Sequence, residues 1–153
     1  MRGLTGWGKG FTLIEVMVVV AITAVLVTLA GPPFVRLIAD QRAKSAASNL
    51  FTAMLVARSE AIKHNRNVTL RPKPGGWEFG WVILDPEGGA DLLDVNATGV
   101  IITGGPASVI YNGGGRLAGG STAPSFTIGE PTMPQRCVSV DLTGRPYSKG
   151  AAC

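Results

Sequence analysis

The distribution of hydrophobic and polar positions divides the 153-residue chain into three stretches. Ten Gly-rich residues, with Arg2 and Lys9 among them, come first. Residues 11–30 are predominantly apolar, carry Glu15 as their single charge, and have about the length of a helix that spans a bilayer. Helical spacing continues to about residue 64, after which the pattern changes to that of short strands. The sequence therefore predicts an α+β protein with a long N-terminal helix.

The second half of this helix is amphipathic. Pro32 and Pro33 are expected to kink or locally melt the helix, because proline lacks an N–H and clashes with the preceding turn. Helical spacing then resumes from about Phe34 to His64, with an apolar stripe at steps of three and four residues. The stripe consists of Ala43, Ala46, Ala47, Leu50, Met54, Ala57 and Ala61. Asn65 to Asn67 should end the helix, because asparagine favours chain reversal.

Short β-branched and aromatic runs follow, separated by Gly and Pro clusters. The expected strands are Val68–Arg71, Trp77–Leu84, Leu92–Val95, Val100–Thr103, Ser108–Asn112, Ser125–Ile128 and Cys137–Leu142. The short connections favour an antiparallel arrangement. We expect the amphipathic half of the helix to pack its alanine and leucine stripe on an antiparallel β-sheet.

Glu15 is the most informative polar position in the first stretch. A carboxylate within a membrane-spanning segment is costly and marks a functional site that needs a partner. A secretory signal peptide would have a shorter apolar region that ends in a small-residue cleavage site, whereas here Pro32-Pro33 follows. A plain membrane anchor fits the hydropathy but leaves Glu15 without a role.

The Gly10-Phe11 junction, the continuation Thr12-Leu13-Ile14-Glu15 and the apolar helix together resemble the class III signal of type IV pilins and type II secretion pseudopilins. The resemblance implies that a prepilin peptidase cuts between Gly10 and Phe11 and methylates the new amine of Phe11. It also implies that Glu15 pairs with the N-terminal amine of a neighbouring subunit during assembly, which would supply the opposite charge that a carboxylate in hydrocarbon needs.

Features farther along the chain resemble the GspH/FimT family of minor pilins. They are the helical piece Ala57–Ile62, the strand Val68–Leu70, the segment from Trp77 to Trp81 and the late pair Gly144-Arg145. This resemblance implies a low-abundance subunit in an initiating complex at the tip of a fibre, rather than the bulk filament subunit. The corresponding organisation is a leader at 1–10, a transmembrane and assembly helix at 11–33, and a periplasmic globular domain at 34–153, on a single-pass protein of the bacterial inner membrane.

The charges are unevenly distributed. Removal of the leader lowers the formal net charge from +4 to +2, so overall basicity says little about partners. Residues 34–75 nevertheless carry eight Lys and Arg against Asp40 and Glu60, while residues 76–103 carry five acids and no Lys or Arg. These groups form either a solvated surface without a role or complementary patches that orient neighbouring subunits.

The sequence contains two cysteines, Cys137 and Cys153. Outside the inner membrane they would be in an oxidising compartment, where one intramolecular disulfide is expected. In the chain-entropy model, a loop of this size contributes roughly 3 kcal/mol. Two unpaired thiols are the alternative.

No catalytic constellation is present in the sequence. His64 is the single histidine and stands at the expected helix end, where a solvated or helix-terminal role is the simplest interpretation. Asp91 and Asp94 could touch calcium, but no complete ligand loop surrounds them. We expect a non-enzyme without cofactor or metal, which is itself the substrate of a peptidase.

DNA is a further candidate partner. Some FimT-like minor pilins bind DNA through a C-terminal Gly-Arg-x-Arg element, and here Gly144-Arg145-Pro146-Tyr147 has tyrosine in place of the second arginine. Arg136 and Lys149 are the other cations nearby, and phosphate contacts need clustered cations. The sequence favours a minor pilin that assembles into a type IV pilus or primes its assembly. Two alternatives stay open: the minor pseudopilin H of type II secretion, and a DNA-binding minor pilin for natural transformation.

Overall fold

The structure of this protein is a computed structural model that describes residues 10–119 and 122–153. The chain divides into two compact units, one ending at Val35 and the other comprising Arg36–Cys153. Helix α1 (Leu13–His64) contributes residues to both units. Most of the expected leader, residues 1–9, lies outside the described residues.

Helix α1 ends at His64, as the sequence predicts. Asn65 has a φ of 47°, in the left-handed region that asparagine tolerates better than most residues. The Asn65 N–H donates to Ile62 O and the Arg66 N–H donates to Ala61 O, each at 3.2 Å. This pair of bonds is the Schellman arrangement, which satisfies carbonyls of the last helical turn. The expected stop signal at Asn65 is therefore confirmed, and its cause is local.

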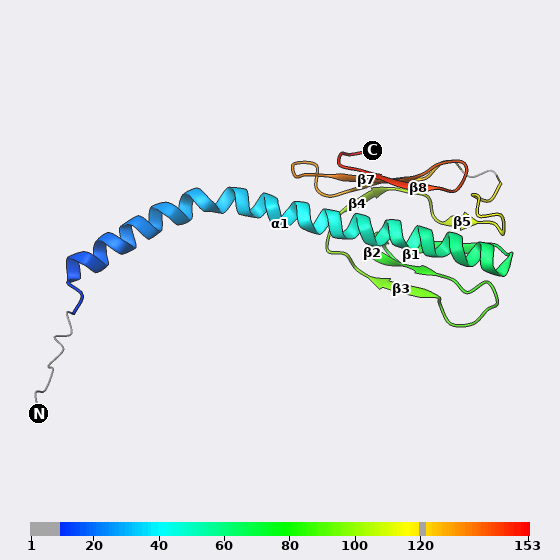
Figure 1. The fold of residues 1–153 in the computed structure, drawn as a ribbon, viewed down its shortest axis with the longest axis horizontal. Helices are drawn as coiled ribbons and strands as arrows, with labels where there is room; N and C mark the ends of the chain where they lie inside the picture. Colours follow the sequence, from blue (N-terminus) through cyan, green and yellow to red (C-terminus); the bar gives the residue numbers. More distant parts are fainter. Residues whose placement is uncertain (1–9, 120–121) are drawn as a thin grey trace, which may run out of the picture. The chain divides into compact units, whose positions relative to one another are not determined.

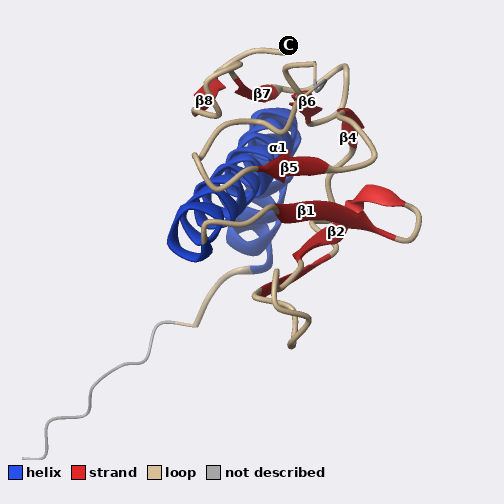
Figure 2. Ribbon diagram, turned by 90° about the vertical axis from the view of Figure 1, so that its right-hand side faces the viewer, coloured by secondary structure: helices blue, strands red, loops and turns tan. Residues whose placement is uncertain are grey.

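Eight strands follow the helix and form two antiparallel sheets (Figures 1 and 2). They are β1 (Val68–Lys73), β2 (Gly76–Ile83), β3 (Leu93–Asn96), β4 (Ile102–Gly104), β5 (Val109–Tyr111), β6 (Ser125–Ile128), β7 (Arg136–Val140) and β8 (Pro146–Lys149). The first sheet has the order β3-β2-β1-β5 and the second has the order β4-β6-β7-β8. All pairings in both sheets are antiparallel.

The part of α1 that belongs to the second unit lies along both sheets (Figure 2). Its stripe of small residues and leucine is buried, and so are the apolar residues that the strands turn toward it. Trp77 joins the two sheets, because its ring lies edge-on against Phe126 of β6 with centroids 4.8 Å apart. Its Nε1–H donates to Pro106 O at 2.9 Å, so the hydrogen-bond donor of the indole has a partner. One continuous core thus fixes both sheets on the helix.

The fold class is confirmed, and two details differ from the sequence-based expectation. The strands form two sheets, because β4 joins β6 in the second sheet while the next strand, β5, returns to β1 in the first. This passage of the chain from one sheet to the other depends on tertiary packing, so the hydrophobic pattern along the sequence does not predict it. Strand β8 was not expected, because it is short, begins with Pro146 and has exposed side chains from Tyr147 to Lys149. These features are typical of an edge strand.

Candidate functional site

The start of α1 holds the residues that the sequence assigns to processing and assembly. Gly10 and Phe11 precede the helix, and the Phe11 side chain is 81% exposed. Thr12 caps the helix, since its Oγ1 accepts a hydrogen bond from the Glu15 N–H at 3.3 Å. Glu15 lies in the first turn, where the helix dipole favours a negative charge. The T-x-x-E spacing is a capping-box signal, and it is the feature of the sequence that predicts this start of the helix.

The first half of α1 presents apolar side chains on every side. From Leu13 to Val27 its leucine, isoleucine, methionine and valine side chains are all exposed within this chain. The hydroxyls of Thr23 and Thr28 donate to the helix carbonyls of Val19 and Val25, at 2.7 and 2.8 Å. A helix that is apolar all round requires an apolar environment, and hydroxyls bonded to their own backbone are compatible with one.

The length and hydropathy of α1 bear on whether it could span a bilayer. Within residues 10–119 and 122–153, no helix taken singly meets the combination of length and hydropathy that a bilayer span requires. Two helical pieces that are bent relative to one another, Leu13–Thr28 and Pro33–His64, meet the requirement for a membrane span together, by length and composition alone. The expected interruption at Pro32-Pro33 lies at the junction of these pieces.

The structure separates the three cations that were expected to bind DNA. Arg136 stands at the first position of β7, whereas Arg145 follows the far end of that strand. Arg136 also forms an ion pair with Asp40 of α1. Lys149 pairs with Cys137 across the strands, and its Nζ lies 5.4 Å from the centroid of the Tyr147 ring. Arg145 is therefore not clustered with the other two, which weakens the expected phosphate-binding element.

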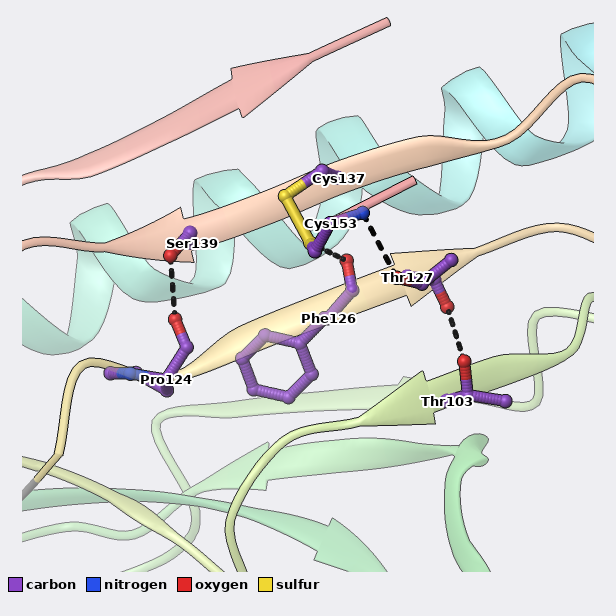
Figure 3. The surroundings of a disulfide bond; sticks show 7 residues. All are labelled: Thr103, Pro124, Phe126, Thr127, Cys137, Ser139 and Cys153. Atoms are coloured by element: carbon purple, nitrogen blue, oxygen red, sulfur yellow. Dashed lines mark hydrogen bonds between the residues drawn. A yellow bond between two sulfur atoms is a disulfide. The ribbon is translucent and has the colours of Figure 1, made fainter. Parts of the chain in front are cut away.

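The disulfide between Cys137 and Cys153 is present, which confirms the expected pairing (Figure 3). It holds the last residues of the sequence across the second sheet. The Cys153 N–H donates to Thr127 Oγ1 at 3.1 Å, so the tail reaches past β7 to β6. The end of the sequence is thereby fastened to two neighbouring strands, β6 and β7.

The uneven charges are partly neutralised within the chain. Lys73 of β1 forms an ion pair with Asp94 of β3. His64 lies between two carboxylates, with Nε2 3.2 Å from Glu60 Oε2 and Nδ1 3.3 Å from Glu87 Oε1. His64 is thus a helix-terminal residue in a charged cluster. Across residues 10–119 and 122–153, no group of three or more His, Cys, Asp or Glu is placed to hold a metal ion.

Two buried polar groups lie in the core beneath the helix. Tyr111 of β5 and Trp81 of β2 are fully buried, and neither the Tyr111 hydroxyl nor Trp81 Nε1 has a hydrogen-bond partner among the described residues. Burial raises the pKa of the Tyr111 hydroxyl well above its ordinary value, so this group stays neutral. We assign both side chains to packing of the core, to which they belong.

Comparisons with known proteins agree with this geometry. The family model described as type II transport protein GspH matches residues 46–144, and the prokaryotic N-terminal methylation motif matches residues 9–31. Among curated proteins, none matches the chain significantly in sequence.

Two crystal structures of the type IV minor pilin FimU of Pseudomonas aeruginosa, strain PAO1, resemble this fold. One, in space group P65, has a TM-score of 0.60 and 23% identity over 69% of this chain and 91% of its own length. The other, in space group P21, has a TM-score of 0.60 and 22% identity over 71% of this chain and 89% of its own. With the processing motif and the helix-on-sheets domain both in place, the chain belongs to the GspH family and has a prepilin-type N-terminus.

Proposed function

We propose that this chain is a minor pilin that assembles into a type IV pilus or primes its assembly. The observation that carries the proposal is the first half of α1, which is apolar on every side, begins with Glu15 in its first turn and matches the N-terminal methylation motif. A structural subunit of this kind needs no catalytic centre. Its function depends on contacts with other subunits.

The proposed pathway starts at the inner membrane. A prepilin peptidase removes residues 1–10 and methylates the amine of Phe11, while residues 11–33 hold the chain in the bilayer and the domain beginning at residue 34 is periplasmic. Phe11 is exposed and lies outside the hydrogen-bonded part of the helix, as a peptidase substrate requires. Upon assembly, Glu15 pairs with the amine of a neighbouring subunit, because an unpaired carboxylate is costly in an apolar fibre core.

The type of machine is the second part of the proposal. The resemblance to FimU, the disulfide and the Gly144-Arg145 pair favour a pilus. The family name, type II transport protein GspH, favours the alternative, a minor pseudopilin of type II secretion.

Deletion of the gene in its source bacterium separates the two machines. We expect surface pili, measured as major pilin in the sheared fraction, to fall and to return when the full chain is supplied again. Secretion of type II substrates should be unchanged. If piliation stayed normal and secretion were lost, the chain would be assigned to the pseudopilus of type II secretion instead. If neither piliation nor secretion changed, the proposal would be wrong.

A further inference from the structure

The β7–β8 turn, Asp141–Arg145, is an exposed feature that the proposed function does not yet use. Leu142 at its tip is 71% exposed, more than any other large hydrophobic side chain described in residues 36–153. An isolated exposed leucine needs no explanation by itself. This leucine differs because the turn around it is held in one conformation.

Asp141 organises the turn. Its Oδ1 accepts three hydrogen bonds: from the Thr143 hydroxyl at 2.6 Å, from the Thr143 N–H at 2.8 Å and from the Arg145 N–H at 2.9 Å. The Gly144 N–H donates to Asp141 O at 2.9 Å and the Asp141 N–H donates to Arg145 O at 3.1 Å. A turn with this many internal bonds loses little conformational entropy when it binds a partner.

A second contact supports the turn from behind. Gly144 has a φ of +81°, and a Cβ at this position would lie 2.3 Å from Gly115 O and 3.0 Å from Arg116 Cα. The turn therefore packs directly on the β5–β6 loop. That loop is fastened to the helix, because Arg58 Nε donates to Gly115 O at 2.8 Å. The tip is thus rigidly connected to α1.

The surroundings of Leu142 are basic. The arginines on either side of the Gly144 contact, Arg116 and Arg145, are both exposed, and neither forms an ion pair with a described residue. The Asp141 carboxylate is engaged within the turn. An apolar tip flanked by arginines is typical of a protein–protein contact, where arginine is enriched and apolar anchors fill pockets of the partner.

We propose that the β7–β8 turn docks on an acidic surface of a different pilin-like subunit, with Leu142 entering an apolar depression and with Arg145 and Arg116 facing carboxylates. This inference rests on the proposed function. Charge complementarity selects the partner. DNA is a poorer fit, because phosphate binding makes no use of an exposed leucine.

A second copy of this chain is also a poorer partner. Its acidic stretch, residues 76–103, has most of its carboxylates engaged already. Glu87 lies against His64 and Asp94 pairs with Lys73. The Asp85 carboxylate accepts hydrogen bonds from the N–H groups of Glu87 and Gly89, both at 2.9 Å. Glu78 and Asp91 are the two carboxylates of this stretch that are not engaged in this way. A different subunit with a larger set of free carboxylates therefore fits the arginines of the turn better than a second copy does.

Site-specific photo-crosslinking of the full chain in its source bacterium tests the proposal. A benzophenone amino acid replaces Leu142 in one strain and Phe79 in the control strain, since Phe79 is 50% exposed on β2. We expect an adduct with another pilin-like protein from position 142, through a peptide rich in Asp and Glu, and none above background from position 79. Arg145→Glu should lower the adduct yield by about tenfold, whereas the exposed Arg71→Glu should change it less than about twofold.

Each other outcome overturns the proposal. An adduct with a second copy of the chain or with DNA assigns the turn to a different partner, and equal yields from positions 142 and 79 remove its role in docking. An adduct that Arg145→Glu leaves unchanged removes the charge argument. Formation of the Cys137–Cys153 disulfide in each variant reports that the domain is folded. If the chain is found in fibres without the adduct, this inference fails while the proposed function stands.

Discussion

Arg136 of β7 and Asp40 of α1 form an ion pair, with Nη2 2.5 Å from Oδ1. The two residues are separated by 96 positions in the sequence. Each side chain is only 27% exposed, so the pair is partly shielded from water. It connects the second sheet to the helix near the start of the globular unit. The arginine that the sequence offered as a DNA contact thus has a structural role.

Removal of either partner should destabilise the domain. We expect Asp40→Ala or Arg136→Ala to lower the free energy of unfolding by about 1–2 kcal/mol, because a partly buried charge-assisted hydrogen bond is lost. The double variant should cost less than the sum of the two single variants. Urea unfolding of residues 36–153 measures these values. The exposed control, Lys63→Ala, should lower the free energy of unfolding by about 0.5 kcal/mol or less, because its pair with Glu60 is solvated. If the effects of the Asp40 and Arg136 variants were strictly additive, the result would contradict the pairing.

The elements that the sequence predicts well are those whose causes are local. The end of α1 depends on Asn65, and strand β6 occupies the expected residues 125–128 because it alternates between buried and exposed positions. Strand β8 has no such alternation and exists because its backbone pairs with β7. The division into two sheets likewise depends on contacts between distant residues. Patterns along a chain carry no information of that kind.

The same distinction applies to the candidate site. The motif around Gly10 and Glu15 is contiguous, so the sequence is sufficient to propose it. Arg136 and Arg145 are close in sequence, yet the length of β7 separates them. The pairing of Arg136 with Asp40 could not be expected, because nothing in the sequence indicates that β7 lies beside this turn of the helix.

Processing should depend on the small residue before the junction. We expect Gly10→Val and Gly10→Glu to block cleavage, since a side chain at this position hinders access to the scissile bond. N-terminal sequencing of the chain recovered from membranes should give Phe11 as the first residue in the wild type and none of this product in the variants. Gly3→Val, within the expected leader, is the matched control and should be processed normally. A mature N-terminus elsewhere would contradict the assigned junction.

Loss of the disulfide should loosen the last residues of the sequence. We expect Cys153→Ser to lower the free energy of unfolding by about 1–3 kcal/mol and to make residues 150–153 sensitive to carboxypeptidase. Cys137→Ser should cost more, because Cys137 is buried and the new hydroxyl has to be desolvated there. Mass mapping under non-reducing conditions should recover the joined peptides from the wild type. Free thiols in protein exported to the periplasm would contradict the expectation.

The β7–β8 turn should respond to acid. The hydrogen bond from the Thr143 hydroxyl, followed by that from the Arg145 N–H, lowers the pKa of Asp141 below its ordinary value. The unfolded chain therefore takes up this proton more readily, so the stabilisation is complete above about pH 4 and is lost as the pH falls through the lowered pKa. Asp141→Asn keeps an acceptor oxygen and removes the titration.

Urea midpoints measured from neutral pH to about pH 2 test this linkage. The wild type should be more stable than Asp141→Asn at neutral pH, and the two midpoints should converge in acid. Asp91→Asn is the control, because Asp91 makes no hydrogen bond or ion pair with a described residue, and its difference from the wild type should not show this convergence. Parallel curves for Asp141→Asn and the wild type would show that the carboxylate charge has no role in the turn.

Glu15 has two possible contributions to assembly, and three variants separate them. In the first turn of α1, its charge favours the start of the helix by about 0.3–1 kcal/mol; in a fibre, it would pair with the amine of a neighbour. Glu15→Ala removes both contributions. Glu15→Gln keeps the capping-box chemistry and removes the charge. Thr12→Ala removes the cap seen at Thr12 Oγ1 and keeps the charge.

If the charge pairs with a neighbour, Glu15→Gln should fail as Glu15→Ala does. We expect both variants to insert into the membrane and to lower the fraction of the chain in sheared fibres by about tenfold, the change that about 1.4 kcal/mol produces. Thr12→Ala should retain most of its incorporation, because a single cap is worth only about 1 kcal/mol and the neighbouring apolar residues still favour the helix. Immunoblots of fibre and membrane fractions measure the ratio. Normal incorporation of Glu15→Gln would show that Glu15 acts through the start of its own helix and that no intermolecular charge pair is needed.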